Sequence, residues 1–90
     1  MAPELLRLRR QGLEWLTADG EIVALDLESS NYLATNPSGA LLWGALVGGA
    51  TRKELVSKLV EAFGVDPEGA RADVDAFVAQ LSEQGLLEGE

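Results

Sequence analysis

The sequence predicts an α+β domain of the winged helix-turn-helix kind, in which a three-stranded antiparallel sheet is followed by three helices. Two observations support this prediction. Apolar residues repeat with a period near two from Gly12 to Asn36, as in half-buried strands, and with a period near 3.6 after Asn36, as in amphipathic helices. With 90 residues, of which 47% are apolar, the chain is long enough for one core and too short for two.

Three strands are predicted in the first part of the chain. Residues 13–18 and 21–27 form a hairpin, because Asp19-Gly20 between them is a strong signal for a tight turn. The alternation gives each strand two faces: Leu13, Trp15 and Thr17 against Glu14 and Leu16, and Val23, Leu25 and Leu27 against Ile22, Ala24 and Asp26. After a short polar turn, residues 31–35 form the third strand.

Three helices are predicted in the second part, each with its own start and stop signals. The start signals are Asn36-Pro37, the capping box Thr51 to Glu54, and Asp66-Pro67, and the stop signals are Gly48-Gly49, Gly64 and Gly85. The apolar stripes expected to face the core are Leu41, Leu42, Ala45 and Leu46, then Leu55, Val56, Leu59, Val60 and Phe63, and then Ala70, Val74, Phe77, Val78 and Leu81. Trp15 and Trp43 are expected to anchor the packing.

Residues 1–12 precede the predicted domain, which we place at residues 13–88. Leu6, Leu8 and the nearby arginines alternate as they would in an edge strand. The same pattern is compatible with an N-terminal arm outside the sheet. The sequence leaves both alternatives open.

Composition excludes several classes of function. The chain has no Cys and no His, which excludes thiolate and imidazole metal sites and catalysis by Cys or by a Ser–His pair. No acidic cluster has the spacing of a calcium loop, and no glycine-rich segment has the sequence of a phosphate loop, so we expect neither a metal nor a cofactor. The carboxylates of the third helix do not form a pair, and we therefore expect no enzyme activity.

The charge of the chain argues against nucleic acid as a partner. Acidic residues outnumber basic ones by 15 to 7, which gives a net charge of -8. Residues 66–85, which include the recognition helix of a DNA-binding winged helix, carry Arg71 against five acidic residues. No apolar stretch is long enough to cross a membrane, and arginines interrupt the first ten residues where a signal peptide would be apolar. The sequence therefore predicts a cytoplasmic protein without a membrane partner.

A surface for an extended peptide is the remaining candidate site. The third strand lies at an edge of the predicted sheet and lacks the Pro or Lys that would discourage pairing with another strand. The third helix combines small residues with Val74, Phe77 and Val78, so a groove between this helix and the edge strand could accept peptide side chains. The alternative is that these three residues belong to the core and that Tyr32 only covers a neighbouring side chain.

Four segments carry a family resemblance through their order and spacing: Val23–Leu27, Tyr32–Trp43, Thr51–Leu55 and Leu81–Leu87. Together they resemble the PqqD-like family, the precursor-recognition domains of ribosomally made, post-translationally modified peptides. The resemblance covers residues 13–88 and implies a non-catalytic adaptor. In this family the leader segment of the precursor adds as a further strand to the third strand, with its side chains in the cleft beside the third helix.

The resemblance implies a peptide-binding site with two sides. The edge-strand side consists of Asn31, Tyr32, Leu33, Ala34 and Thr35, and the cleft side consists of Ala70, Asp73, Val74, Phe77 and Val78. Thr35 stands where the family usually has an aliphatic residue.

A separate acidic protein of this length most resembles the recognition proteins of lasso-peptide pathways. This resemblance implies a precursor leader peptide, a cysteine peptidase and a macrolactam-forming synthetase as partners. The alternatives are a structural subunit of a modification complex and a PqqD-like carrier in another peptide-modification pathway. A DNA-binding winged helix is the least favoured alternative.

Overall fold

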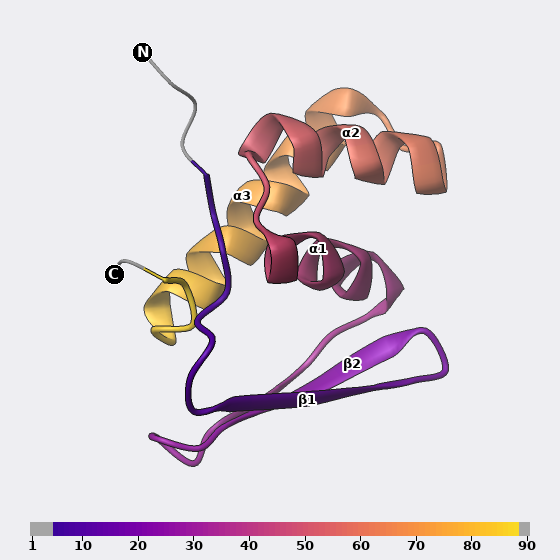
Figure 1. Cartoon of the computed structure of the whole chain (residues 1–90). Coiled ribbons are helices and arrows are strands. Elements are labelled where there is room, and N and C mark those ends of the chain that lie inside the picture. The colour runs from indigo at the N-terminus through magenta and orange to yellow at the C-terminus, as the bar shows by residue number, and fades with distance from the viewer. Residues whose placement is uncertain (1–4, 89–90) are drawn as a thin grey trace.

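The sheet and the helices form two layers (Figure 1). The computed structural model describes residues 5–88. Its elements are β1 (Leu13–Ala18), β2 (Glu21–Asp26), β3 (Tyr32–Ala34), α1 (Pro37–Gly48), α2 (Arg52–Phe63) and α3 (Pro67–Glu83). The strands are antiparallel and lie in the order β1-β2-β3. The predicted fold class and element order are therefore confirmed. Within the described residues, no helix has both the length and the apolar character that crossing a membrane requires.

The tight turn between β1 and β2 forms at the predicted position. Asp19 and Gly20 both have positive φ, 53° and 77°. Two successive residues in this conformation match the right-handed twist of the flanking strands, which is why Asp-Gly favours such hairpins. The turn fixes the register of the pair, in which Leu16 lies opposite Val23.

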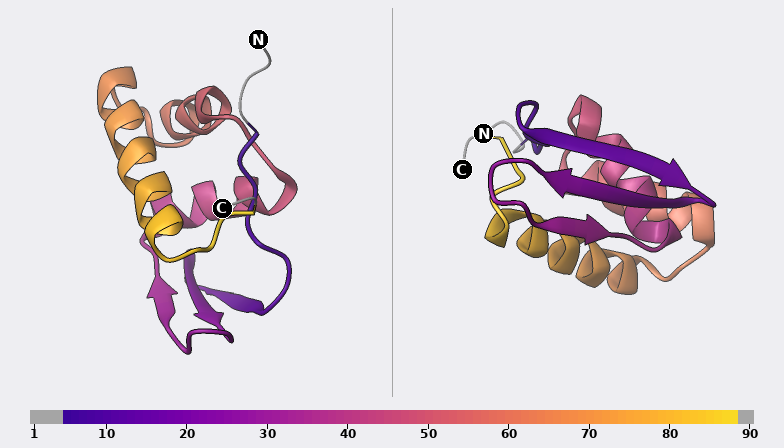
Figure 2. Two further views of the ribbon diagram at one scale, coloured as in Figure 1. Left: turned by 90° about the vertical axis from the view of Figure 1, so that its left-hand side faces the viewer. Right: turned by 90° about the horizontal axis from the view of Figure 1, so that it is seen from below.

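Within residues 5–88, helices cover one face of the sheet and leave the other uncovered (Figure 2). The inner sheet face, turned toward the helices, contributes Leu13, Ile22, Ala24 and Leu33, each at most 7% exposed. The outer sheet face carries Leu16, Val23, Leu25, Leu27 and Tyr32, which are 39% to 73% exposed. The even-numbered residues of β2 are therefore the buried ones, which the alternation in the sequence does not decide by itself.

The helix starts are capped by the residues that the sequence indicates. The side chains of Asn36 and Asp66 each accept a hydrogen bond from the backbone N–H three residues further on. Thr51 and Glu54 form a reciprocal capping box, with distances of 3.1 and 2.9 Å. Gly64 ends α2 in the left-handed conformation, with φ of 64°.

The core lies between the sheet and the three helices. Trp43 is fully buried, and the ring of Trp15 meets it edge-on with 5.6 Å between the centroids. The predicted helical stripes are buried or partly buried with one exception. Phe63 is 47% exposed, so its prediction as a core residue is wrong. It occupies the last turn of α2, where the helix ends at the surface.

The described part of the predicted arm is an extended segment that joins the helical layer instead of the sheet. Leu6 and Ala50 exchange two backbone hydrogen bonds of 2.8 Å, and the Arg9 N–H donates to the Leu86 carbonyl at 2.8 Å. Leu6 and Leu8 are buried in the core. We call residues 5–12 the strap. Residues 1–4 of the predicted arm lie outside the described residues.

Arg9 ties the strap to the sheet and to the C-terminal turn. Its guanidinium forms an ion pair with Asp26 and donates to the Gly85 carbonyl at 2.8 Å. Burial of Asp26 by itself would raise the pKa of its carboxyl. Hydrogen bonds from the Ser29 hydroxyl, the Glu28 N–H and Arg9 outweigh the burial and hold the pKa of Asp26 below its ordinary value.

Candidate functional site

The strand β3 is an edge of the sheet, so one side of its backbone has no neighbouring strand among the described residues. The Asn31 carbonyl accepts a hydrogen bond from β2 at 2.8 Å, and the Thr35 N–H donates one to β2 at 2.8 Å. Backbone polar groups point alternately to the two sides of an antiparallel strand. Tyr32 and Ala34 therefore direct their N–H and C=O groups away from β2, toward the free edge.

The side chain of Thr35 strengthens the end of the β2–β3 pairing. Its Oγ1 accepts a hydrogen bond from the Ile22 N–H at 3.1 Å, while its own N–H donates to the Ile22 carbonyl. Thr35 is 8% exposed, so an unpaired hydroxyl there would be costly. This bond explains how a threonine replaces the aliphatic residue usual at this position.

Three adjoining hollows that share lining residues form one groove beside the free edge, between β3, the start of α1, α2 and α3. We call it the β3–α3 groove. Its lining residues, from the β3 end toward the end of α2, are Leu33, Ala34, Thr35, Asn36, Pro37, Ser38, Gly39, Leu42, Gln80, Phe77, Ala76, Asp73, Leu59, Phe63 and Val65. In the view from below the sheet, α3 runs alongside β3 (Figure 2, right). The groove is therefore oriented to hold a chain lying along the edge.

Gly39 has no side chain, and this allows the start of α1 to approach Phe77 of α3 closely at the groove. A Cβ at this position would lie 3.3 Å from Cε1 of Phe77 and 3.0 Å from Cβ of Thr35. Both distances are shorter than the optimal van der Waals separation of two carbon atoms, which is about 3.5–4.0 Å. Gly39 also donates its N–H to Asn36 at 2.8 Å, so the helix cap and the groove wall share one residue.

The predicted site residues fall into three groups in the structure. Those that line the β3–α3 groove are Leu33, Ala34, Thr35, Asp73 and Phe77. Those buried in the core, lining none of the groove, are Ala70, Val74 and Val78. The exposed ones beside the groove are Asn31 and Tyr32. The burial of Val74 and Val78 agrees with the alternative that they are core residues. Phe77 was part of the same alternative, but it is only partly buried and lines the groove.

Sequence reasoning missed part of the groove wall. Ala76 and Gln80 line it together with Asp73 and Phe77. Asp73 is three and four positions from Ala76 and Phe77, and Gln80 is four and three positions from the same two residues, which places all four on one face of a helix. Their spacing was a usable signal, but a search for apolar residues alone selects the neighbouring buried face instead.

The groove is suited to binding an uncharged or weakly charged chain. Among its described lining residues, Asp73 is the one with an ionisable side chain. A lone carboxylate can attract a cation or accept hydrogen bonds, but general acid–base chemistry on a substrate ordinarily needs further positioned groups. Within residues 5–88, no cluster of three or more acidic side chains could hold a metal ion.

A free strand edge beside a groove defines a binding module of the strand-addition class, in which a bound peptide pairs with the edge and places side chains in the groove. The chain belongs to the PqqD family: residues 21–87 match coenzyme PQQ synthesis protein D. The family resemblance noted in the sequence is therefore confirmed.

Two solved structures are similar to this chain over nearly its whole length. One, "TbiB1 in Complex with the TbiA(beta) Leader Peptide", is 25% identical, with a TM-score of 0.83 and coverage of 93% of this chain and 96% of that chain. The other, "Lasso peptide synthetase B1 complexed with the leader peptide", is 28% identical, with a TM-score of 0.78 and coverage of 91% and 95%. None of the curated proteins compared with the chain matches it.

Proposed function

We propose that this protein is a non-catalytic adaptor that binds the leader segment of a ribosomally made precursor peptide. The leader adds as a strand to β3 and places its side chains in the β3–α3 groove. The observation that carries this proposal is the free edge at Tyr32 and Ala34 directly beside the groove. The two similar structures, each described as a complex with a leader peptide, support the same ligand class.

The backbone of β3 supplies the part of the affinity that does not depend on the leader sequence. Tyr32 and Ala34 together offer two N–H donors and two C=O acceptors to an added strand. Each such hydrogen bond contributes about 0.5–1.5 kcal/mol net. Because a flexible leader loses conformational freedom on docking, these bonds alone give weak binding. Side chains in the groove must supply the remainder and the specificity.

The groove favours alternate leader residues with apolar or aromatic side chains. Only every second residue of an added strand points into the groove. Near β3 the wall is formed by the partly buried ring of Phe77, and further along by the exposed apolar side chains of Phe63 and Val65. Asp73 lies between these two parts and would attract a cationic or hydroxyl-bearing side chain. The buried residues Val74 and Val78 position this wall without touching the peptide.

The partners that we propose beyond the leader are a cysteine peptidase and a macrolactam-forming synthetase, as in lasso-peptide maturation. An adaptor of this kind holds the precursor for enzymes that do the chemistry. The net charge of -8 supports peptide or protein partners over nucleic acid, because the acidic surface repels phosphates. A structural subunit whose edge strand pairs with a second copy is the competing function, since it would use the same β3 edge.

The first experiment is a titration of the purified protein with synthetic leader peptides. Calorimetry and Trp fluorescence measure the binding. A basic peptide of matched charge serves as the ligand control. Ala34→Pro removes one N–H at the free edge and leaves the pairing with β2 intact, and we expect it to weaken leader binding by about 2- to 10-fold. Equal binding of the leader and the basic control would contradict the adaptor function.

A matched pair of variants on α3 tests the groove. Asp73 lines the groove, whereas Asp75 lies two residues away and pairs with Arg52 at 2.9 Å outside it. We expect Asp73→Asn to change the affinity for leaders that carry a cation or hydroxyl near this position. Asp75→Asn should leave the affinity within about twofold, because exposed ion pairs contribute little.

The competing function, a structural subunit, is tested by the mass of the protein in solution. A mass that rises with concentration, and that Ala34→Pro returns to the monomer value, would favour the structural subunit over the adaptor.

A further inference from the structure

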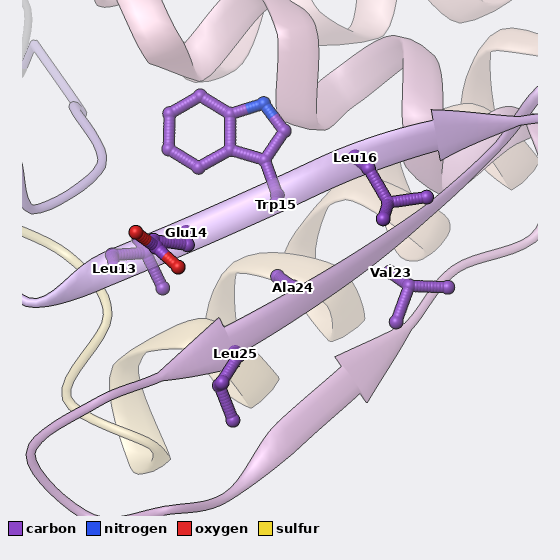
Figure 3. Close-up of a pocket in the computed structure, with 7 residues that line it drawn as sticks. All are labelled: Leu13, Glu14, Trp15, Leu16, Val23, Ala24 and Leu25. Carbon is purple, nitrogen blue, oxygen red and sulfur yellow. The ribbon is translucent and has the colours of Figure 1, made fainter.

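The outer sheet face is an apolar surface that the β3–α3 groove does not use. Leu16 and Val23 lie opposite each other across β1 and β2, and Leu25 lies opposite Tyr32 across β2 and β3. Figure 3 shows Leu16 of β1 beside Val23 of β2, with Leu25 further along β2, opposite Glu14 of β1. These side chains are 39% to 73% exposed, and Leu27 continues the patch at 51%.

This exposure is unusual for a sheet of a small protein. Antiparallel sheets with one covered face ordinarily carry polar residues on the other. Large apolar patches rimmed by polar residues mark places where another molecule binds, whereas single exposed apolar side chains do not. Here five exposed apolar side chains gather on one face that also carries Glu14 and Glu21. The outer sheet face and the groove lie on opposite sides of β3, because Leu33 points to the helices and Tyr32 points away from them. Both surfaces are therefore accessible at the same time.

The charge around the patch identifies the kind of partner. Between Arg10 and Arg52 the chain contains no Lys or Arg, while Glu14 and Glu21 lie on the outer side of the same two strands. A second copy of this chain would bring the same carboxylates against one another, because a twofold interface repeats one patch on both subunits. A partner surface with an apolar centre and a border of Lys and Arg would match the apolar side chains of the patch and the carboxylates of Glu14 and Glu21.

The size of the patch indicates how tight the contact is. The two six-residue strands extend about 20 Å and the three strands span about 10 Å across, so even with the shorter β3 the face projects onto an area of at most roughly 200 Å². The accessible surface of its side chains is larger than this projected area. A stable complex buries roughly 800 Å² on each partner. The outer sheet face can therefore be the apolar centre of an interface whose polar border extends beyond it, or the whole of a transient one.

We infer that the outer sheet face docks a second protein, whose contact surface has an apolar centre bordered by Lys and Arg, while a peptide occupies the β3–α3 groove. The simultaneous peptide and the choice of a peptidase as the partner rest on the proposed function, whereas the docking surface rests on the exposed apolar face and its charge. In this arrangement the sheet separates the two partners, one on its free edge and inner side and the other on its outer side. The protein would thereby hold a peptide and a peptide-processing enzyme in one complex.

The test uses the cysteine peptidase encoded beside the candidate precursor as the probe. Val23→Thr and Val47→Thr form a matched pair, since both replace a valine of similar exposure, 43% and 41%, by a residue of the same shape. Val23 lies on the outer sheet face and Val47 lies on α1. We expect Val23→Thr to weaken peptidase binding and Val47→Thr to leave it within twofold. The double variant Leu16→Thr/Val23→Thr should weaken it at least tenfold. Circular dichroism and thermal unfolding establish that each variant is folded.

Two further measurements complete the test: the dependence of peptidase binding on salt concentration, and the affinity of the variants for the leader. Glu14→Gln/Glu21→Gln should weaken the peptidase complex at low ionic strength and have less effect at high ionic strength. Leader affinity should be the same in the Leu16→Thr/Val23→Thr variant as in the wild type. Unchanged peptidase binding in that variant, no binding to the wild type, or a homodimer that the variant disrupts would each overturn the proposal. Failure of the wild type to bind any leader would overturn the proposed function and leave the peptidase measurement interpretable.

Discussion

The inner and outer faces of the sheet are built from alternate residues of the same strands, yet one face is buried and the other is exposed. Leu13, Ile22, Ala24 and Leu33 are at most 7% exposed, whereas Leu16, Val23, Leu25 and Tyr32 are 39% to 73% exposed. Both faces are apolar, so apolar character alone does not decide which face forms the core. The helices decide it by covering one side, and the uncovered side becomes a surface available for binding.

The largest expected effect is a difference in the free energy of unfolding between a substitution on the inner sheet face and the same substitution on the outer sheet face. Leu33→Ala removes a buried side chain from the inner sheet face and should lower the free energy of unfolding by about 2–5 kcal/mol. Leu16→Ala makes the same substitution on the outer sheet face, where the side chain is 59% exposed, and should change it by no more than about 0.5 kcal/mol. Urea unfolding measures both values. Similar losses would mean that the outer face is covered in solution.

The next effect compares two glycines of α1, one covered and one open. Gly39→Ala places a Cβ against Thr35 and Phe77, and we expect a loss of about 1–3 kcal/mol together with a narrower groove. Gly44→Ala meets no atom within 4 Å and should stabilise the helix by about 0.5–1 kcal/mol. Thermal unfolding of both variants gives the signs, and a stabilising Gly39→Ala would contradict the close packing described at the groove.

The smallest of the three effects concerns Asp26, the charged residue of the inner sheet face. Its pKa is lower in the folded protein than its ordinary value of 3.8, so the unfolded state binds a proton at a higher pH than the folded state. The stability that this ion contributes is complete well above pH 3.8 and is lost as the pH falls below that value through the folded pKa. We expect Asp26→Asn to lower the melting temperature at neutral pH and to flatten its decrease in acid. An unchanged acid profile would show that other carboxylates dominate.

Local sequence signals predicted the helices well. Asn36, the Thr51–Glu54 pair and Asp66 act within four residues of themselves, so the short segments that contain them carry all the information needed. The Asp19-Gly20 turn is a local signal of the same kind. These local signals set the order of the strands and helices, and the family resemblance is carried by the same order and spacing.

The features that the sequence did not predict depend on contacts between distant segments. The pairing of Arg9 with Asp26 requires the strap to cross the helical layer and reach the sheet. Phe63 continues an apolar stripe but extends beyond the helices that would cover it. Of the cleft wall predicted on α3, Asp73 and Phe77 line the groove, and Ala70 lies in the core because the rotation of α3 against its neighbours selects the face.

The strap also has a consequence for how the chain is made. Arg7 accepts a hydrogen bond from the Glu88 N–H, and Arg9 bonds to Gly85 and Leu86, so the first described residues find their partners among the last ones. At translation rates of 5–20 residues per second, roughly 4–16 s separate the synthesis of these partners. During that interval Leu8 lacks its partner Leu87, although Leu6 can already pair with Ala50, and the Arg9 counter-ion of Asp26 lacks its bonds to Gly85 and Leu86. The contacts of the strap are therefore completed only after residues 85–88 have emerged from the ribosome.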